Sequence, residues 1–221
     1  MKSLCYIVGA GEYSGYSVDL SDAYIIAADA GLNTLIELCK TPDIVIGDYD
    51  SLGKTPEDYN FITVPVEKND TDMGLAISEG FRQGAELFII DGGLGGRLDH
   101  TLANIQLLKD ISLKTALGIL LGRDICITVL TNSTLRFSLD ASGVISVFAF
   151  GGLTEGVSLK GLKYPLDNVV LTDIYPVGTS NEFTNENAEI SVQEGSLIIT
   201  WESQPVTLMF KNGRELSISK M

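Results

Sequence analysis

The sequence contains little cysteine and histidine. The three cysteines, Cys5, Cys39 and Cys126, lie far apart and are odd in number. This indicates neither a disulfide framework nor a zinc site built from paired cysteines. Each cysteine lies in an apolar run, which predicts a buried, unreactive thiol in a reducing compartment.

Positive charge is also scarce, since 15 Lys and Arg face 29 Asp and Glu, for a formal net charge of −14. That balance argues against binding nucleic acid through its phosphate backbone, which requires basic surfaces. It suits a cationic small substrate, although acidic surfaces mostly serve solubility. No apolar run approaches the length of a membrane span, and Gly9 interrupts the N-terminal apolar run too early for a signal peptide. We therefore expect a cytoplasmic protein that binds neither nucleic acid nor membranes.

The first part of the chain alternates short apolar runs with segments of helical periodicity. The expected strands are Leu4–Val8, Tyr24–Ala28, Ile44–Ile46, Phe61–Val64 and Leu87–Ile90. Three helices are expected, with these apolar faces: Leu32, Leu35, Ile36 and Cys39; Met73, Ala76, Ile77, Gly80 and Phe81; Leu98, Leu102, Ile105 and Leu108. Such alternation predicts βαβ units in a mostly parallel sheet, a Rossmann-like three-layer α/β domain.

After about Asp110 the helical period disappears. The expected strands are Ala116–Leu121, Ile125–Leu130, Val144–Phe150, Val157–Leu159, Val169–Leu171, Ala188–Val192, Leu197–Trp201 and Val206–Phe210. Turn residues separate most of them at the spacing of a β-sandwich. We place the boundary near Thr131, which predicts an α/β domain over residues 1–131 and an all-β domain over residues 132–221. Trp201 lies in an apolar run and is expected in the core.

A glycine-rich loop follows the strand that ends at Ile90. Gly92, Gly93, Gly95 and Gly96 precede Arg97 and a helical pattern. A glycine turn that opens a helix lets backbone N–H groups approach an anion, and a guanidinium there suits phosphate. The alternative is an ordinary strand-to-helix turn with an exposed arginine. The loop alone does not choose between these two interpretations.

Acidic residues gather at the predicted carboxyl ends of strands, where ligands of parallel sheets bind. They are Asp29, Asp48, Asp50 and Asp91. In an extended segment Asp48 and Asp50 point to the same side and can reach one ion. Oxygen ligands without nearby His or Cys favour Mg²⁺ over zinc, and the alternative is a turn closed by aspartate side chains.

A second acidic group, Lys68-Asn69-Asp70-Thr71-Asp72, opens a predicted helix. Acids at a helix start can simply complement its dipole. A lysine beside carboxylates at this sheet edge also suits a magnesium polyphosphate.

Taken in order, these motifs resemble the thiamine pyrophosphokinase family. The resemblance is carried by Asp29-x-Gly31, Gly47-Asp48-Tyr49-Asp50-Ser51-Leu52, Thr71-Asp72, the stretch Leu94–Asn104, Gly161–Leu166 and Gly178–Phe183. It implies Mg²⁺-dependent transfer of the pyrophosphoryl group of ATP to the hydroxyl of thiamine, with release of AMP. It further implies a homodimer whose active sites draw on both subunits.

The resemblance also assigns roles by matching position. Mg²⁺ would be held by Asp48, Asp50 and Asp72. ATP would be bound by Asp29, Lys68, Gly95, Gly96, Arg97, His100 and Thr101. Catalysis would use Asp72, Arg97 and Asp99, with Asp99 near the thiamine hydroxyl as an orienting group or base. Thiamine would be bound by Asp99, Ser180 and Asn181.

The chain departs from the family pattern at two motifs. Ala30 stands where the family usually has glycine, and Asn69-Asp70 stands where an acid usually follows Lys68 directly. Two other functions use the same residues. One is a metal-dependent nucleotide phosphohydrolase, and the other is a non-catalytic module that binds thiamine or a nucleotide. Carboxylates that repel one another are costly to hold together without a cation, which weakens the second.

Overall fold

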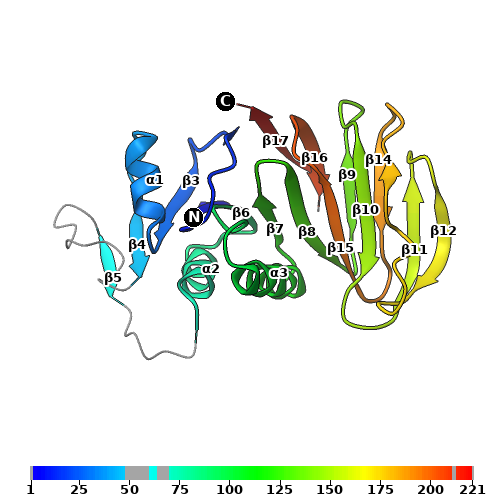
Figure 1. Ribbon diagram of the computed structural model, residues 1–221, viewed down its shortest axis with the longest axis horizontal. Coiled ribbons are helices and arrows are strands. Elements are labelled where there is room, and N and C mark those ends of the chain that lie inside the picture. The colour runs from blue at the N-terminus through cyan, green and yellow to red at the C-terminus, as the bar shows by residue number, and fades with distance from the viewer. Residues whose placement is uncertain (1, 48–59, 64–69, 211–212, 221) are drawn as a thin grey trace. The chain divides into compact units, whose positions relative to one another are not determined.

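The computed structural model describes residues 2–47, 60–63, 70–210 and 213–220, and it is a sheet-rich α/β protein with few helices (Figure 1). The chain forms two compact units, which are described separately below. The first contains Met1–Ser14, Asp19–Leu107 and Gly118–Gly122, and the second contains Gly15–Val18, Leu108–Leu117 and Arg123–Met221. No helix in the described ranges is long and apolar enough to cross a membrane.

The first unit is organised on a sheet whose central strand is β1. Its strand order is β7-β6-β1-β3-β4-β5. The strands are β1 (Leu4–Val8), β3 (Ala23–Ala28), β4 (Ile44–Gly47), β5 (Phe61–Thr63), β6 (Leu87–Asp91) and β7 (Leu117–Leu121). The pairs β1–β3, β1–β6, β3–β4 and β4–β5 are all parallel. The predicted strands and their parallel pairing are therefore confirmed, apart from Val64, which lies outside the described residues.

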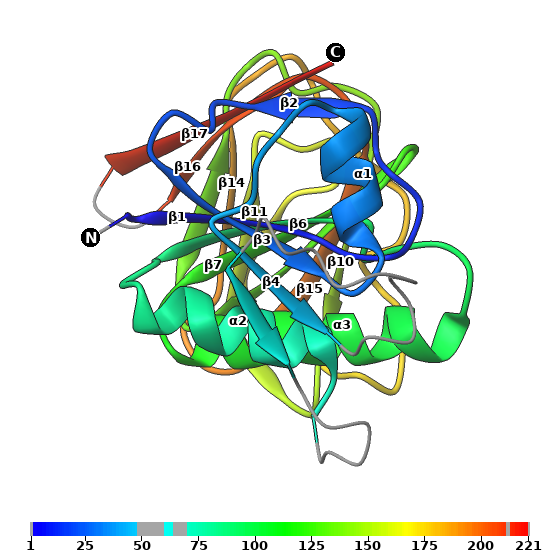
Figure 2. The same cartoon turned by 90° about the vertical axis from the view of Figure 1, so that its left-hand side faces the viewer.

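Helices α1 (Gly31–Glu37) and α2 (Asp72–Arg82) connect strands in opposite directions along this sheet. The step from β3 to β4 moves away from β1, whereas the step from β5 to β6 returns past it. Because such crossovers are right-handed, the two helices lie on opposite faces, as Figure 2 shows. The reversal at β1 makes a switch point, and the loops after β1, β3 and β6 meet at its carboxyl edge.

Four residues of the predicted apolar helix faces are exposed. Ile36 is 50% exposed within α1. Cys39 is exposed because α1 ends at Glu37, and Cys39 already has φ of +53°. The prediction of a buried Cys39 is therefore wrong, while Cys5 and Cys126 are buried as expected. At the start of α3 (Leu98–Leu113), Leu98 and Leu102 are also exposed.

The second unit contains antiparallel strands in two groups, with orders β13-β10-β15-β8 and β12-β11-β14-β9-β16-β17-β2. Its strands are β2 (Tyr16–Val18), β8 (Ile125–Thr131), β9 (Thr134–Phe137), β10 (Val144–Ala149), β11 (Thr154–Lys160), β12 (Leu166–Leu171), β13 (Asn181–Glu182), β14 (Ala188–Ser191), β15 (Ser196–Glu202), β16 (Val206–Phe210) and β17 (Arg214–Lys220). β2, β9, β13 and β17 were not expected.

An aromatic cluster stabilises the core of the second unit. The Phe137 ring packs edge-on against Trp201, with centroids 5.3 Å apart, and against Phe183 at 5.2 Å. Trp201 is 1% exposed, which confirms the expectation that it is a core residue. Burying such rings stabilises a fold through apolar contact and ring geometry together.

Candidate active site

A cavity of about 590 Å³ lies at the switch point of the first unit. It is lined by the ends of β1, β3 and β6 and the starts of α2 and α3. The lining residues are Gly9, Ala10, Gly11, Ala28, Asp29, Thr71, Asp72, Met73, Gly92, Gly93, Gly95, Gly96, Arg97, Asp99, His100, Ala103 and Asn104. Its size falls in the range of small-molecule sites, roughly 300–1,000 Å³.

The wall of the cavity is backbone, because glycines pack where side chains do not fit. Gly92 has φ of +64°, and a Cβ there would come within 2.4 Å of the Gly9 carbonyl oxygen. Gly9 N–H donates to the Asp91 carbonyl at 2.8 Å, and Gly11 N–H donates to that of Gly92 at 2.8 Å. The loops after β1 and β6 are thus joined directly through their main chains. A ligand in the cavity meets peptide groups rather than side chains at this wall.

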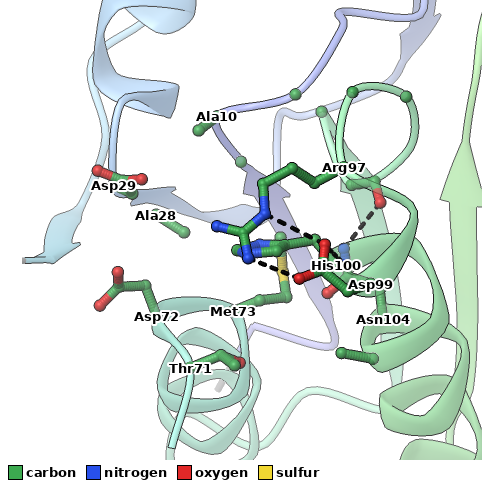
Figure 3. A pocket seen from close by; sticks show the side chains of 17 residues that line it. Ala10, Ala28, Asp29, Thr71, Asp72, Met73, Arg97, Asp99, His100 and Asn104 are labelled. Carbon is green, nitrogen blue, oxygen red and sulfur yellow. Dashed lines mark hydrogen bonds and ion pairs between the residues drawn. The ribbon is translucent and has the colours of Figure 1, made fainter. Parts of the chain in front are cut away.

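Two aspartates lie on one side of the cavity (Figure 3). Asp29 follows β3 with φ of +54°, and its buried Oδ1 has no hydrogen-bond partner among the described residues. Asp72 is the first residue of α2, whose N-cap is Thr71: the Thr71 hydroxyl accepts from Gly74 N–H at 3.0 Å. An unpaired buried carboxylate oxygen is costly, so Asp29 suits a cation or a donor on a ligand.

Arg97 and Asp99 form an ion pair on the other side of the cavity (Figure 3). Arg97 donates through Nε to Asp99 Oδ1 at 3.1 Å and through Nη2 to Oδ2 at 2.5 Å. Both side chains are largely exposed. The hydrogen bonds from Arg97 are the largest cause that lowers the pKa of Asp99, and Asp99 in turn raises the pKa of Arg97. Asp99 is therefore ionised, and Arg97 is held with its guanidinium over the cavity.

The cavity brings together most of the predicted residues of the first unit that the structure describes. Asp29, Asp72, Gly95, Gly96, Arg97, Asp99 and His100 all line it. Thr101 is not among its lining residues. Asp48, Asp50 and Lys68 lie outside the described residues. No cluster of three potential metal ligands occurs among the residues that are described.

Some cavity residues were not anticipated from the sequence. Met73, Ala103 and Asn104 line the cavity, and Asn104 Nδ2 donates to the Gly93 carbonyl at 2.7 Å. Asn104 lies one helical turn after His100, so helical spacing was an available signal. A buried polar side chain on the cavity side of a helix needs a hydrogen-bond partner, and the backbone of a neighbouring loop can supply it.

In the second unit, Asn181 is 3% exposed and binds the backbone of Tyr164. Its Oδ1 accepts from Tyr164 N–H at 2.9 Å, and its Nδ2 donates to the Tyr164 carbonyl at 2.8 Å. Ser180 has φ of +57°, and its N–H donates to the Ser146 hydroxyl at 3.0 Å. These two predicted thiamine-binding residues are thus neighbours where a turn enters β13, and both are hydrogen-bonded to other segments.

Residues 19–121 match the family described as "Thiamin pyrophosphokinase, catalytic domain", and residues 132–197 match "Thiamin pyrophosphokinase, vitamin B1 binding domain". The thiamine pyrophosphokinase of Bacillus subtilis is 30% identical over 182 residues, which cover 79% of this chain and 85% of that protein. This chain belongs to the thiamine pyrophosphokinase family.

Further relatives agree with this family. Thiamin pyrophosphokinase 1 of Caenorhabditis elegans is 27% identical over 195 residues, covering 81% of this chain and 79% of that protein. The crystal structure of the Bacillus subtilis thiamine pyrophosphokinase superposes with a TM-score of 0.80 at 25% identity, covering 91% of this chain and 99% of that one. The crystal structure of the Geobacillus thermodenitrificans thiamin pyrophosphokinase superposes with a TM-score of 0.79 at 27% identity. The match covers 91% of this chain and 98% of that one.

The two family matches divide the candidate residues of this thiamine pyrophosphokinase family member. The catalytic-domain match contains the cavity residues from Ala28 onward, while Gly9, Ala10 and Gly11 precede it. The vitamin B1 binding match contains Ser180 and Asn181. The residues that were predicted to bind ATP and those predicted to bind the thiamine ring therefore fall in different matches.

Proposed function

We propose that this protein is a Mg²⁺-dependent thiamine pyrophosphokinase, which converts ATP and thiamine to AMP and thiamine pyrophosphate. The thiamine oxygen forms a bond to the β-phosphorus of ATP, and the bond from that phosphorus to the oxygen bridging the α-phosphate breaks. AMP leaves with that oxygen, and the hydroxyl proton is released. The observation that carries the proposal is the cavity in which Arg97, a glycine loop and two aspartates meet.

The polyphosphate of ATP would lie against the glycine loop and Arg97. Gly95 and Gly96, with φ of +83° and +64°, form the turn that opens α3, and His100 lies on its first turn. Backbone N–H groups at a helix start and a guanidinium both stabilise phosphate oxygens. Positioning and charge neutralisation supply most of the catalysis in phosphoryl transfer. Lys68 and Thr101 also stay candidates for binding ATP.

Mg²⁺ fits the donors that line this cavity. The unpartnered Oδ1 of Asp29 and the carboxylate of Asp72 are oxygen donors, which Mg²⁺ prefers. We assign its binding to Asp48, Asp50 and Asp72, of which Asp72 is described. When bound, the ion would neutralise negative charge on the phosphate oxygens.

Asp99 would orient groups rather than accept the proton of thiamine. Its lowered pKa makes it a weak base, and its two hydrogen bonds to Arg97 fix the guanidinium that faces the phosphates. The carboxylate still carries a charge that can receive a hydrogen bond from the thiamine hydroxyl. We therefore assign Asp99 to positioning both the arginine and the nucleophile.

Thiamine binding is assigned to the second part of the chain, through Ser180 and Asn181. We propose that residues 1–131 form a Rossmann-like three-layer domain for ATP and Mg²⁺, and that residues 132–221 form a β-sandwich for thiamine. A cytoplasmic homodimer that shares its active sites completes this proposal. Sedimentation at the mass of a monomer would contradict the dimer.

The reaction is tested by chromatography of the products formed from ATP, Mg²⁺ and thiamine. We expect AMP and thiamine pyrophosphate in equal amounts, both dependent on thiamine. A metal-dependent phosphohydrolase would instead release inorganic phosphate from ATP without thiamine. A binding module would bind its ligands and form no product.

Replacing Asn181 with alanine is expected to raise the KM for thiamine about tenfold while the KM for ATP changes little. The reason is that the Asn181 side chain makes three hydrogen bonds to the backbones of Tyr164 and Glu182, which hold the segment in place. A tenfold change corresponds to a loss of about 1.4 kcal/mol. Steady-state kinetics with each substrate varied in turn measures the effect.

Thr184→Ala is the matched control for Asn181→Ala. The Thr184 hydroxyl donates to the Gly161 carbonyl at 3.0 Å, so the variant also removes a bond between side chain and backbone nearby. An equal loss in both variants would assign the effect to the turn as a whole. An equal rise in the KM for both substrates would show that the effect is not specific to thiamine.

A further inference from the structure

Asp91, the last residue of β6, is a buried carboxylate that lines no part of the cavity yet lies between the two loops that do. It is 0% exposed. Its Oδ1 accepts from Ser14 N–H at 2.8 Å and from its neighbour Gly92 N–H at 2.8 Å. Its Oδ2 accepts from the Ser14 hydroxyl at 2.6 Å and from the Tyr6 hydroxyl at 3.4 Å. Four donors therefore converge on one carboxylate.

Most of these hydrogen bonds join residues that are far apart in the sequence. Ser14 lies 77 residues before Asp91, at the end of the loop that leaves β1. Main-chain bonds hold the beginning of that loop: Gly9 donates to Asp91 itself, and Gly11 and Glu12 donate to the loop after β6. The carboxylate of Asp91 binds the other end. The loop over residues 9–14 is therefore fixed at both ends against the glycine loop.

The charge state of the network agrees with this arrangement. Burial is the largest cause that raises the pKa of Tyr6, and the charge of Asp91 adds to it, so Tyr6 stays a neutral O–H donor. Burial also raises the pKa of Asp91, while the hydrogen bonds from Ser14, Gly92 and Tyr6 oppose that rise. A buried carboxylate is tolerated when its oxygens receive such donors, and costly when it does not.

We propose that Asp91 is a positioning residue for the nucleotide site. It acts through Ser14, holding the loop over residues 9–14 so that the glycine backbone faces the polyphosphate. Asp91 itself touches no substrate. This inference rests on the proposed function, because it takes the cavity as the site of ATP.

Two substitutions of Asp91 separate the role of its oxygens from that of its size. Asp91→Leu has a similar branched shape without acceptors, and it leaves the N–H groups of Ser14 and Gly92 unpaired. Asp91→Asn keeps an oxygen for both N–H groups, and its amide can donate to the Ser14 hydroxyl. We expect Asp91→Leu to raise the KM for ATP about tenfold or more, with the KM for thiamine little changed. Asp91→Asn should restore nearly normal values.

Two further variants serve as controls. Ser14→Ala removes the hydroxyl but keeps the backbone bond, so it should give a smaller rise in the same KM, even if Asp91→Leu does not fold. Ile119→Ala truncates a residue that is 0% exposed in β7 and does not line the cavity. It should lower the melting temperature without changing the KM for ATP.

The deciding experiment combines these kinetics with hydrogen exchange of the wild-type protein, Asp91→Leu and Asp91→Asn. We expect faster exchange at Gly11, Glu12 and Ser14 in Asp91→Leu alone. An unchanged KM for ATP in Asp91→Leu, or an equal change in Ile119→Ala, overturns the inference while the proposed function stands. If the wild-type protein forms no thiamine pyrophosphate, the proposed function fails, and the exchange rates still decide whether Asp91 holds the loop.

Discussion

Replacing Arg97 with alanine is expected to lower kcat about 100- to 1,000-fold, the usual cost of removing a donor that stabilises charge in the transition state. The melting temperature should not change, because the Arg97 side chain is 71% exposed and its partner Asp99 is 63% exposed. An exposed ion pair contributes little to stability. Steady-state turnover with ATP and thiamine at saturation, together with a thermal melt, measures both effects.

Two controls define what Arg97 supplies. Arg97→Lys keeps the positive charge but loses the planar fork, so we expect a partial loss of turnover. Arg136→Ala removes the same charge from an exposed pair with Glu189 in the second unit, and turnover should stay normal. Near-normal turnover in Arg97→Ala would remove this residue from the phosphate site. A shared loss in both alanine variants would instead indicate a general effect of net charge.

The parallel part of the fold was predictable because its strands are short apolar runs. Leu4–Val8 and Leu87–Asp91 are buried along almost their whole length. Strands buried on both faces appear in a sequence as continuous apolar runs, which are easily recognised. The unexpected strands are short or polar: β2 has three residues and β13 has two. β17 does alternate, with Leu216 and Ile218 buried, but its polar residues hide that signal.

The site was predictable where its residues are neighbours in sequence. Arg97, Asp99 and the glycines before them share one loop, so their proximity follows from the chain itself. The bond between Ser14 and Asp91 could not be found this way. It depends on the register of β1 with β6, in which Val8 pairs with Asp91, and on the path of the chain after Gly9. The prediction that Cys39 is buried was wrong because the sequence did not show where α1 ends, and Cys39 lies beyond the end of this short helix.

The metal assignment also depends on which acid at the start of α2 binds the ion. Asp70 and Asp72 are two residues apart, and the family pattern differs from this chain beside them. The structure separates them: Asp72 lines the cavity, whereas Asp70 is exposed and accepts from Thr71 N–H at 2.8 Å. We therefore take Asp72 rather than Asp70 as the candidate ligand of a phosphate-bound cation.

Asp72→Asn is expected to lower kcat about 100-fold or more and to raise the Mg²⁺ concentration that gives half-maximal rate. The amide is a poorer ligand for a hard cation than a carboxylate. The fold should survive, because Thr71 caps α2 and the lost acid in its first turn contributes only about 0.3–1 kcal/mol. Asp70→Asn removes the same charge two residues away and should leave the Mg²⁺ dependence unchanged. Initial rates over a range of Mg²⁺ at fixed ATP compare the two variants, and the opposite pattern would move the metal ligand from Asp72 to Asp70.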